Sequence, residues 1–184
     1  MEREQALNLM KNHVKNKNLR KHMLATEAVM AHLARELGED SERWGLIGLI
    51  HDVDYDRTEK EPEKHGQVGA EILEEEGFPP DIISAVKAHN PALGEPRDNR
   101  VKKAIYAVDP VTGLIVACAL VHPEKKLSAL DVDFIMNRFK EKGFARGANR
   151  EQIQTCEEEL GIELEDFLGL SLKAMQSISK ELGL

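Results

Sequence analysis

The stretch Trp44–Asp56, WGLIGLIHDVDYD, is the part of the sequence around which the rest is expected to fold. An almost unbroken apolar run ends in His51 and Asp52, and Asp54 and Asp56 follow. Moving even a neutral polar group into an apolar interior costs roughly 2 kcal/mol or more, and a charge costs far more. We therefore expect these groups to have strong partners. The alternative is that Asp52 only ends a core helix and that His51 is a satisfied interior histidine.

Composition predicts an all-α protein. Ala, Leu, Glu and Lys dominate, aromatic residues make up only 4%, and strand-like alternation is hard to find. A length of 184 residues without a low-complexity linker suits one domain, 1–184, built as a helical bundle of about eight to ten helices.

Charge and cysteine usage favour a soluble, cytoplasmic protein that binds a small molecule. The formal net charge is -8, which disfavours binding to a nucleic acid polymer. Two cysteines, Cys118 and Cys156, have no spacing typical of a zinc knuckle or a disulfide framework. The N-terminus lacks a signal-peptide apolar region, and the longest apolar run is far shorter than the 18 or more residues of a membrane span.

Helical periodicity places further polar residues beside apolar faces. A helix is expected from Asn18, its cap, to Leu37, with His22 beside its apolar stripe, and Ser41 is expected to cap a helix over Trp44–Asp52. Helices over about 62–76 and 80–89 bring His65 and His89 to the core side. Each histidine taken alone is more often a boundary residue than a ligand.

Asp109 lies among apolar residues of the segment 101–121, for which Asp98 or Asn99 is the expected cap. Pro110 follows it directly, so the chain either kinks there or begins a new helix that Asp109 caps. Later helices are expected over about 128–141, 149–160 and 163–182, with Asn149 and Gln152 as a capping box.

Six side chains share one property, because each can bind a metal and lies on or beside an apolar face. Four imidazoles and two carboxylates without a thiolate form a nitrogen and oxygen ligand set for one or two divalent ions of Mn, Fe, Co, Ni, Mg or Zn. The six are His22, His51, Asp52, His65, His89 and Asp109. A ligating imidazole also needs a partner for its other N–H, and Asp54 or Asp56 can serve.

These residues resemble the HD-domain superfamily of metal-dependent phosphohydrolases, which carry a first His, a His-Asp doublet and a later Asp. The stretch 48–54 is similar to the HDIG pattern, although Asp54 stands where that pattern has glycine. The resemblance covers about residues 18–120, which leaves a C-terminal helical extension over about 121–184. It implies one ion held by His22, His51, Asp52 and Asp109, with Asp52 bridging to a second ion held by His65 and His89.

The predicted reaction is hydrolysis of a small phosphate monoester or diester, such as a nucleotide, by metal-activated water, with His51 and Asp52 at its centre. Arg146, between Gly143 and Gly147, is the expected phosphate contact. It belongs to a basic run of Arg138, Lys140, Lys142, Arg146 and Arg150, whose plain interpretation is a solvated helix end and loop, and Lys64 and Lys87 are rivals. Two other functions remain open: an HD-type diiron oxygenase, or a metal-stabilised binding module without turnover.

Overall fold

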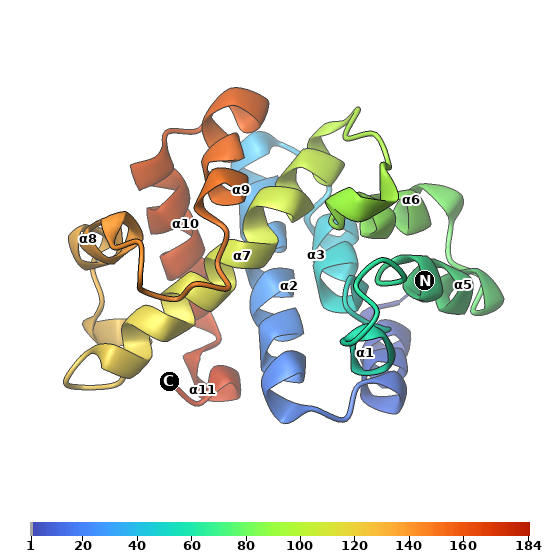
Figure 1. Ribbon diagram of the computed structural model, residues 1–184, viewed down its shortest axis with the longest axis horizontal. Helices are drawn as coiled ribbons and strands as arrows, with labels where there is room; N and C mark the ends of the chain where they lie inside the picture. Colours follow the sequence, from blue (N-terminus) through green and yellow to red (C-terminus); the bar gives the residue numbers. More distant parts are fainter. Residues whose placement is uncertain (1) are drawn as a thin grey trace.

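The computed structural model describes residues 2–184, and its regular elements in this range are all helical (Figure 1), which confirms the predicted fold class. The N-terminal elements are α1 (Arg3–His13), α2 (Lys17–Leu37), α3 (Ser41–Ile50), α4 (Tyr55–Thr58), α5 (Gln67–Glu75), α6 (Pro80–Ala88) and η1 (Pro91–Leu93). The remaining elements are α7 (Arg100–Val121), η2 (Leu127–Ala129), α8 (Val132–Lys140), α9 (Arg150–Thr155), the π-helical turn η3 (Cys156–Leu160), α10 (Leu164–Ser177) and α11 (Ser179–Leu182). Their buried apolar side chains form one continuous core.

Helix α3 is the central element, since every residue from Trp44 to Ile50 is buried. It packs on α1, α2, α6 and α7. A side chain at Gly48 would come within 2.7 Å of the Thr26 carbonyl oxygen, so this glycine permits the close approach of α3 to α2. The expected helix over Trp44–Asp52 ends two residues early, and His51 and Asp52 lie in the turn that follows, beside α2.

Helix boundaries differ from expectation where a neighbouring side chain is the better cap. Asn16, not Asn18, accepts the N–H groups that begin α2, and Asp40, not Ser41, caps α3. Asn149 caps α9 as expected, but Gln152 does not return its side chain to complete a capping box; it bonds to another helix.

The helix expected over about 62–76 begins only at Gln67. Gly66 has a φ of +81°, a left-handed conformation that glycine adopts without strain, and it ends a series of turns. His65 therefore projects from a turn and not from a helix. The short helix α4 precedes these turns.

Helix α7 runs without interruption through Pro110, and Asn99 is its cap. The alternative in which Asp109 caps a new helix at Pro110 is therefore wrong. In Figure 1, α7 crosses the molecule, with α8 and α10 toward the left and α5 and α6 toward the right. Asp109 lies halfway along it, where α7 passes α2.

By length and composition alone, α7 is apolar enough to cross a membrane. We expected no such segment, because the longest apolar run in the sequence is far shorter than the 18 or more residues of a membrane span. A helix that runs through a protein core passes the same test, and 56% of the most apolar window of α7 is buried within the protein. The composition of α7 is thus weak support for a membrane span.

Candidate metal centre

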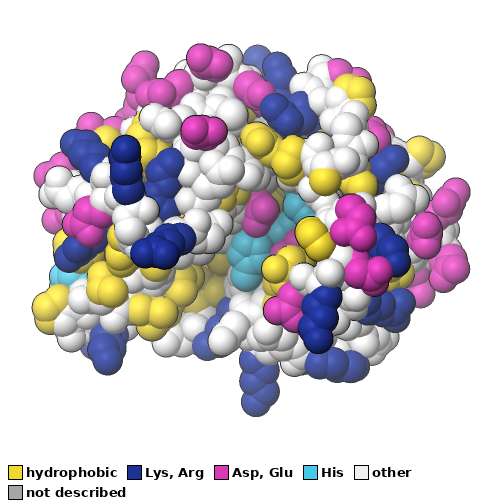
Figure 2. Space-filling model, viewed as in Figure 1, with side chains coloured by type: hydrophobic (Ala, Val, Ile, Leu, Met, Phe, Trp, Pro, Cys, Tyr) yellow, Lys and Arg dark blue, Asp and Glu magenta, His cyan; other side chains and the backbone are white. Residues whose placement is uncertain are grey.

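The six predicted ligands lie together at the bottom of one cavity. It has a volume of about 390 Å³, and five of the six line it, while His51 is fully buried behind them. Figure 2 shows histidine side chains in a hollow near the centre of this face, with acidic and hydrophobic side chains beside them. The lining residues are Leu19, His22, Asp52, Tyr55, His65, His89, Asn90, Pro91, Asp109 and Gln152.

One group consists of His22, His51, Asp52 and Asp109. The Nε2 atoms of His22 and His51 are 3.2 Å apart, and each is 3.4 Å from Asp52 Oδ2. Asp109 Oδ1 lies 3.1 Å from His22 Nε2 and 3.7 Å from His51 Nε2. These donors converge on one point from α2, α7 and the turn after α3.

The second group uses the other oxygen of the same carboxylate. Asp52 Oδ1 lies 3.2 Å from His65 Nε2 and 3.6 Å from His89 Nε2. The two Nε2 atoms are 2.7 Å apart. Asp52 therefore presents one oxygen to each group, which is the arrangement that a bridging carboxylate requires.

All four imidazoles have their Nδ1 atom bonded outside the cluster. His51 Nδ1 donates to the Gly48 carbonyl at 2.8 Å, and His89 Nδ1 donates to the Val86 carbonyl. His65 Nδ1 donates to Asp54 Oδ1 at 3.0 Å. Since each of these acceptors requires the proton on Nδ1, every Nε2 atom faces the cluster, and it offers a lone pair there whenever its imidazole is neutral.

Thr112 fixes the fourth imidazole. Its hydroxyl lies 3.1 Å from the Asp109 carbonyl, to which it donates, and 2.8 Å from His22 Nδ1. A hydroxyl that gives its proton to a carbonyl accepts from the other neighbour, so His22 Nδ1 is the donor. Thr112 thereby also connects two residues of one group through a single atom.

Asp54 meets the expectation of a carboxylate behind a ligating histidine. It is completely buried, and its Oδ2 accepts the N–H groups of Gly66 and Gly69, each at 2.8 Å, while its Oδ1 accepts from His65. Burial by itself raises the pKa of Asp54, but these bonds outweigh it and hold the pKa below the ordinary value. Asp56 plays a different part, since its carboxylate accepts the N–H groups of Lys15 and Asn16 between α1 and α2.

In each group the neighbouring carboxylates favour a protonated imidazole. Burial lowers the pKa of His22, but hydrogen bonds with Asp109 and Asp52 outweigh it and raise the pKa to about 10. The pKa of His65 likewise reaches about 10, because Asp52 and Asp54 outweigh the effect of burial. Burial lowers the pKa of His89 to about 4, and the nearby positive charge of His51 adds to the shift. One imidazole of the second pair is thus protonated while the other is not.

The carboxylates stay ionised in this setting. Burial would raise the pKa of Asp52, but the charge of His51 and hydrogen bonds with His22 and His65 hold it well below the usual range. The same opposition lowers the pKa of Asp109, where His22 and His51 outweigh burial. Imidazole Nε2 atoms that face each other at about hydrogen-bond distance, beside ionised oxygens, favour a cation between them, which is a proton without metal and can be a metal ion in its place. The donor set therefore fits divalent metal ions at two adjacent positions.

No lysine or arginine lines this cavity within residues 2–184. Arg146 is exposed and is not among the lining residues, so the structure does not bring it together with the six predicted ligands. Arg150 donates to backbone carbonyls, including those of Phe144 and Ala148, and so has a structural role. The rivals Lys64 and Lys87 form ion pairs with Glu61 and Glu95.

Sequence reasoning missed the polar residues around the predicted ligands. Tyr55 lies at the cavity edge, with its ring 5.2 Å from that of His65, and the Asn90 side chain donates to the His65 carbonyl at 2.8 Å. Thr112 lies inside α7, and no sequence pattern marks it as a partner of His22. Gln152 comes from the C-terminal extension and carries no periodicity signal that would link it to a site.

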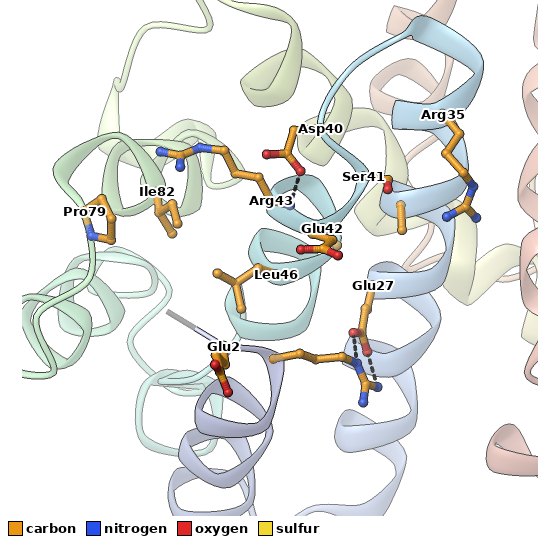
Figure 3. A pocket seen from close by; sticks show the side chains of 13 residues that line it. Glu2, Glu27, Arg35, Asp40, Ser41, Glu42, Arg43, Leu46, Pro79 and Ile82 are labelled. Atoms are coloured by element: carbon orange, nitrogen blue, oxygen red, sulfur yellow. Dashed lines mark hydrogen bonds and ion pairs between the residues drawn. The ribbon is translucent and has the colours of Figure 1, made fainter.

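A larger cavity of about 670 Å³ lies between α1, α2, α3 and α6 (Figure 3). Its lining contains no histidine, and several of its charged side chains already have partners. Arg3 pairs with Glu27, Arg43 pairs with Asp81, and Asp40 accepts from the Arg43 backbone N–H. It lacks the convergent donors of the smaller cavity.

Comparison with known families agrees with this geometry. The HD-domain family model matches residues 19–128, more than half of the chain, and the chain therefore belongs to the HD-domain family. HD domains bind divalent metals and are mostly metal-dependent hydrolases. The match includes all six predicted ligands and ends before the segment that carries Arg146 and Gln152.

Individual proteins are similar to this chain over regions of different length. Ribonuclease Y of Nitratidesulfovibrio vulgaris is 29% identical over 98 residues, which are 53% of this chain and 18% of that protein. Ribonuclease Y 2 of Bdellovibrio bacteriovorus is 33% identical over 81 residues, 44% of this chain and 15% of that protein. An uncharacterized protein of Methanocaldococcus jannaschii is 27% identical over 150 residues, 77% and 86% of the two chains. The match thus spans about a fifth or less of either ribonuclease Y.

Proposed function

We propose that this HD-domain protein is a metal-dependent phosphohydrolase that cleaves a phosphate ester with activated water. The observation that carries the proposal is that two pairs of imidazole nitrogens face the two oxygens of one carboxylate, Asp52. The residues that would hold the ions are His22, His51, Asp52, His65, His89 and Asp109. Divalent ions, when bound, supply an activated water and neutralise the charge that gathers on the phosphoryl oxygens.

The chain itself supplies the surroundings for this chemistry. No serine or cysteine lines the cavity within the described residues, which favours water over a protein nucleophile. Both cysteines are buried elsewhere, and burial raises the pKa of the Cys118 thiol to about 11. Burial also raises the pKa of Tyr55, followed by the charge of Asp52, so its hydroxyl stays protonated and can donate to a phosphoryl oxygen.

For the substrate, we propose a small phosphate ester such as a nucleotide. The cavity holds about 390 Å³, its lining has no lysine or arginine within residues 2–184, and the chain carries a net charge of -8. These features disfavour tight binding to a long phosphate backbone. The relatives named ribonuclease Y make RNA the competing substrate, and the same site would then act on one phosphodiester of the strand.

We further propose that the protein works in a reducing compartment such as the cytoplasm. Cys118 and Cys156 are both free and buried, and they form no disulfide. Reduced cysteines are the norm in the cytosol. A mass spectrum of alkylated protein from intact cells would test this, and recovery in an extracellular fraction with oxidised thiols would contradict it.

A phosphate-ester panel on protein of known metal content tests the function. Metal-free protein is reloaded with Mn²⁺, Co²⁺, Ni²⁺ or Mg²⁺ and assayed with nucleoside monophosphates, cyclic nucleotides, 4-nitrophenyl phosphate and a short oligoribonucleotide. We expect metal-dependent turnover of at least one ester without oxygen, and none with Asp52→Ala. A metal-loaded protein inert toward every ester would overturn the proposal, and an oxygen-dependent activity with iron would favour the diiron oxygenase instead.

A further inference from the structure

The side chain of Gln152 compensates for a defect in α7. In an α-helix the N–H of residue 110 would donate to the carbonyl of Tyr106, but Pro110 has no N–H. The Gln152 side-chain nitrogen donates to this carbonyl at 2.7 Å. This contact explains why α7 continues through Pro110 without leaving a partly buried carbonyl unpaired.

Gln152 is held firmly enough to act as a brace. Its backbone N–H donates to Asn149 Oδ1 at 3.1 Å, which fixes it in the first turn of α9. A second contact connects α7 to η3. The Arg97 guanidinium lies 3.9 Å from the centre of the Tyr106 ring and forms an ion pair with Glu159 of η3 at 3.0 Å. The turn of α7 around Tyr106 is thus bound to α9 and η3 from outside the family match.

The braced turn carries a predicted ligand. Asp109 directly precedes Pro110, and its Oδ1 lies 3.1 Å from His22 Nε2. A change in the path of α7 at this turn would move that carboxylate relative to α2. Gln152 also lines the same cavity as Asp109.

The amide of Gln152 has a defined orientation. A carbonyl can only accept, so the nitrogen must face Tyr106 and the oxygen is left over. No hydrogen bond to this oxygen is found within residues 2–184, and the atom is not sealed from solvent. An acceptor on the wall of a cavity without lysine or arginine can bond to a hydroxyl or amino group of a bound molecule.

We propose that Gln152 is a positioning residue for Asp109 and that its amide oxygen selects ligands carrying a hydrogen-bond donor beyond the phosphate. This inference rests on the proposed function for its ligand class, a phosphate ester with a hydroxyl-bearing or amino-bearing group. It makes the C-terminal extension a part of the site. One side chain thus replaces the N–H that Pro110 lacks, by donating to the Tyr106 carbonyl, and lines the cavity.

A metal titration of metal-free protein tests the positioning role without any turnover. Gln152→Ala should weaken Mn²⁺ binding by less than the roughly 10-fold that loss of a direct partner of a metal ligand costs, because Gln152 acts through the Tyr106 carbonyl and not on Asp109 itself. Adding Pro110→Ala restores an N–H for the Tyr106 carbonyl and should recover most of the affinity. Gln154→Ala, an exposed change on the same helix, should have no effect. Gln152→Glu, which keeps the size but cannot donate when ionised, replaces Gln152→Ala should the latter fail to fold.

Unchanged Mn²⁺ affinity in both Gln152 variants, or a loss that Pro110→Ala does not recover, would overturn the positioning role. The selecting role is tested by calorimetric binding to Mn²⁺-loaded protein in the Pro110→Ala background. Gln152→Ala should weaken binding of a nucleoside 5′-monophosphate several-fold more than binding of inorganic phosphate. Equal changes, or no binding of the nucleotide at all, would overturn it. Failure of the hydrolase proposal would appear separately, as bound ligand without turnover.

Discussion

Replacing Asp54 by asparagine should disable the second metal group while leaving the first. The carboxylate holds three donors, namely His65 Nδ1 and the N–H groups of Gly66 and Gly69. In Asp54→Asn the oxygen can keep the two backbone donors only if the amide nitrogen faces His65. That imidazole must then accept at Nδ1, so its proton moves to Nε2 and the lone pair directed at Asp52 is lost.

The expected loss of stability follows from the hydrogen bonds of the Gly66 and Gly69 N–H groups. A hydrogen bond to a charged group contributes about 1.5–3 kcal/mol and a neutral one about 0.5–1.5. Two backbone bonds that change from charged to neutral therefore lose about 2 kcal/mol together, and the completely buried position of Asp54 leaves little solvent to compensate. For a chain of 184 residues this corresponds to a fall in Tm of roughly 4–8 °C. Affinity for the second ion should fall about 10- to 100-fold.

The pH dependence of this loss has a defined sign. Because the pKa of Asp54 is below its ordinary value of 3.8 in the folded protein, its contribution to stability is present above that value. It is lost as the pH falls through the folded-state pKa. The stability difference between the wild type and Asp54→Asn should therefore shrink in acid.

Calorimetric titration of metal-free protein with Mn²⁺, together with ¹⁵N NMR of the imidazoles, measures both effects. Asp56→Asn is the matched control, since Asp56 bonds to Lys15 and Asn16 away from the cavity. It should leave metal binding intact. Asp54→Asn protein that binds both ions with wild-type affinity and keeps the His65 proton on Nδ1 would refute the reasoning.

Three further changes test other parts of the site. His89→Ala should reduce bound metal from about two ions to about one by elemental analysis, whereas Asp52→Ala should impair both groups; wild-type protein that never binds a second ion would end the two-ion hypothesis. The metal-free protein should lose stability in thermal melts as the pH rises from 6.5 to about 10, because the raised pKa values of His22 and His65 stabilise the fold completely only below 6.5. Saturating metal should flatten this decline. A pH profile that does not change with metal would contradict the assignment of these histidines as metal ligands. Arg146→Ala should weaken binding or turnover of an oligoribonucleotide by about 1.5–3 kcal/mol, the contribution of one charged hydrogen bond. A mononucleotide should be unaffected, because Arg146 does not line the cavity. If the mutant and the wild type have the same kinetics with the oligoribonucleotide, Arg146 is a solvated loop residue.

The helices and the cluster of six residues could be predicted because both depend on local pattern. Apolar spacing identified α2, α3, α6 and α7, and a polar residue inside an apolar run stands out wherever it occurs. His51 and Asp109 were found in this way. That the six side chains would converge followed from their shared need for partners and from the resemblance, and the structure places them within a few ångströms.

What could not be predicted depends on contacts between distant segments. The continuity of α7 through Pro110 rests on a side chain of α9, and no local rule joins Gln152 to Tyr106. The expected helix around His65 failed for a related reason. Its turn is held by Asp54, and sequence periodicity cannot show a carboxylate that accepts backbone N–H groups from a later segment.

Asp54 also changes how the departure from the HDIG pattern should be understood. A glycine there would offer no acceptor for His65 Nδ1, Gly66 N–H or Gly69 N–H, and all three lie next to the cavity. Gly69 lets the backbone approach the Asp54 carboxylate closely, since a Cβ atom at position 69 would lie only 3.2 Å from Asp54 Cγ. The aspartate therefore orients the imidazole of the second group and anchors the start of α5. Asp54 in place of the glycine of that pattern is therefore compatible with the proposed second ion, whose ligand His65 it orients.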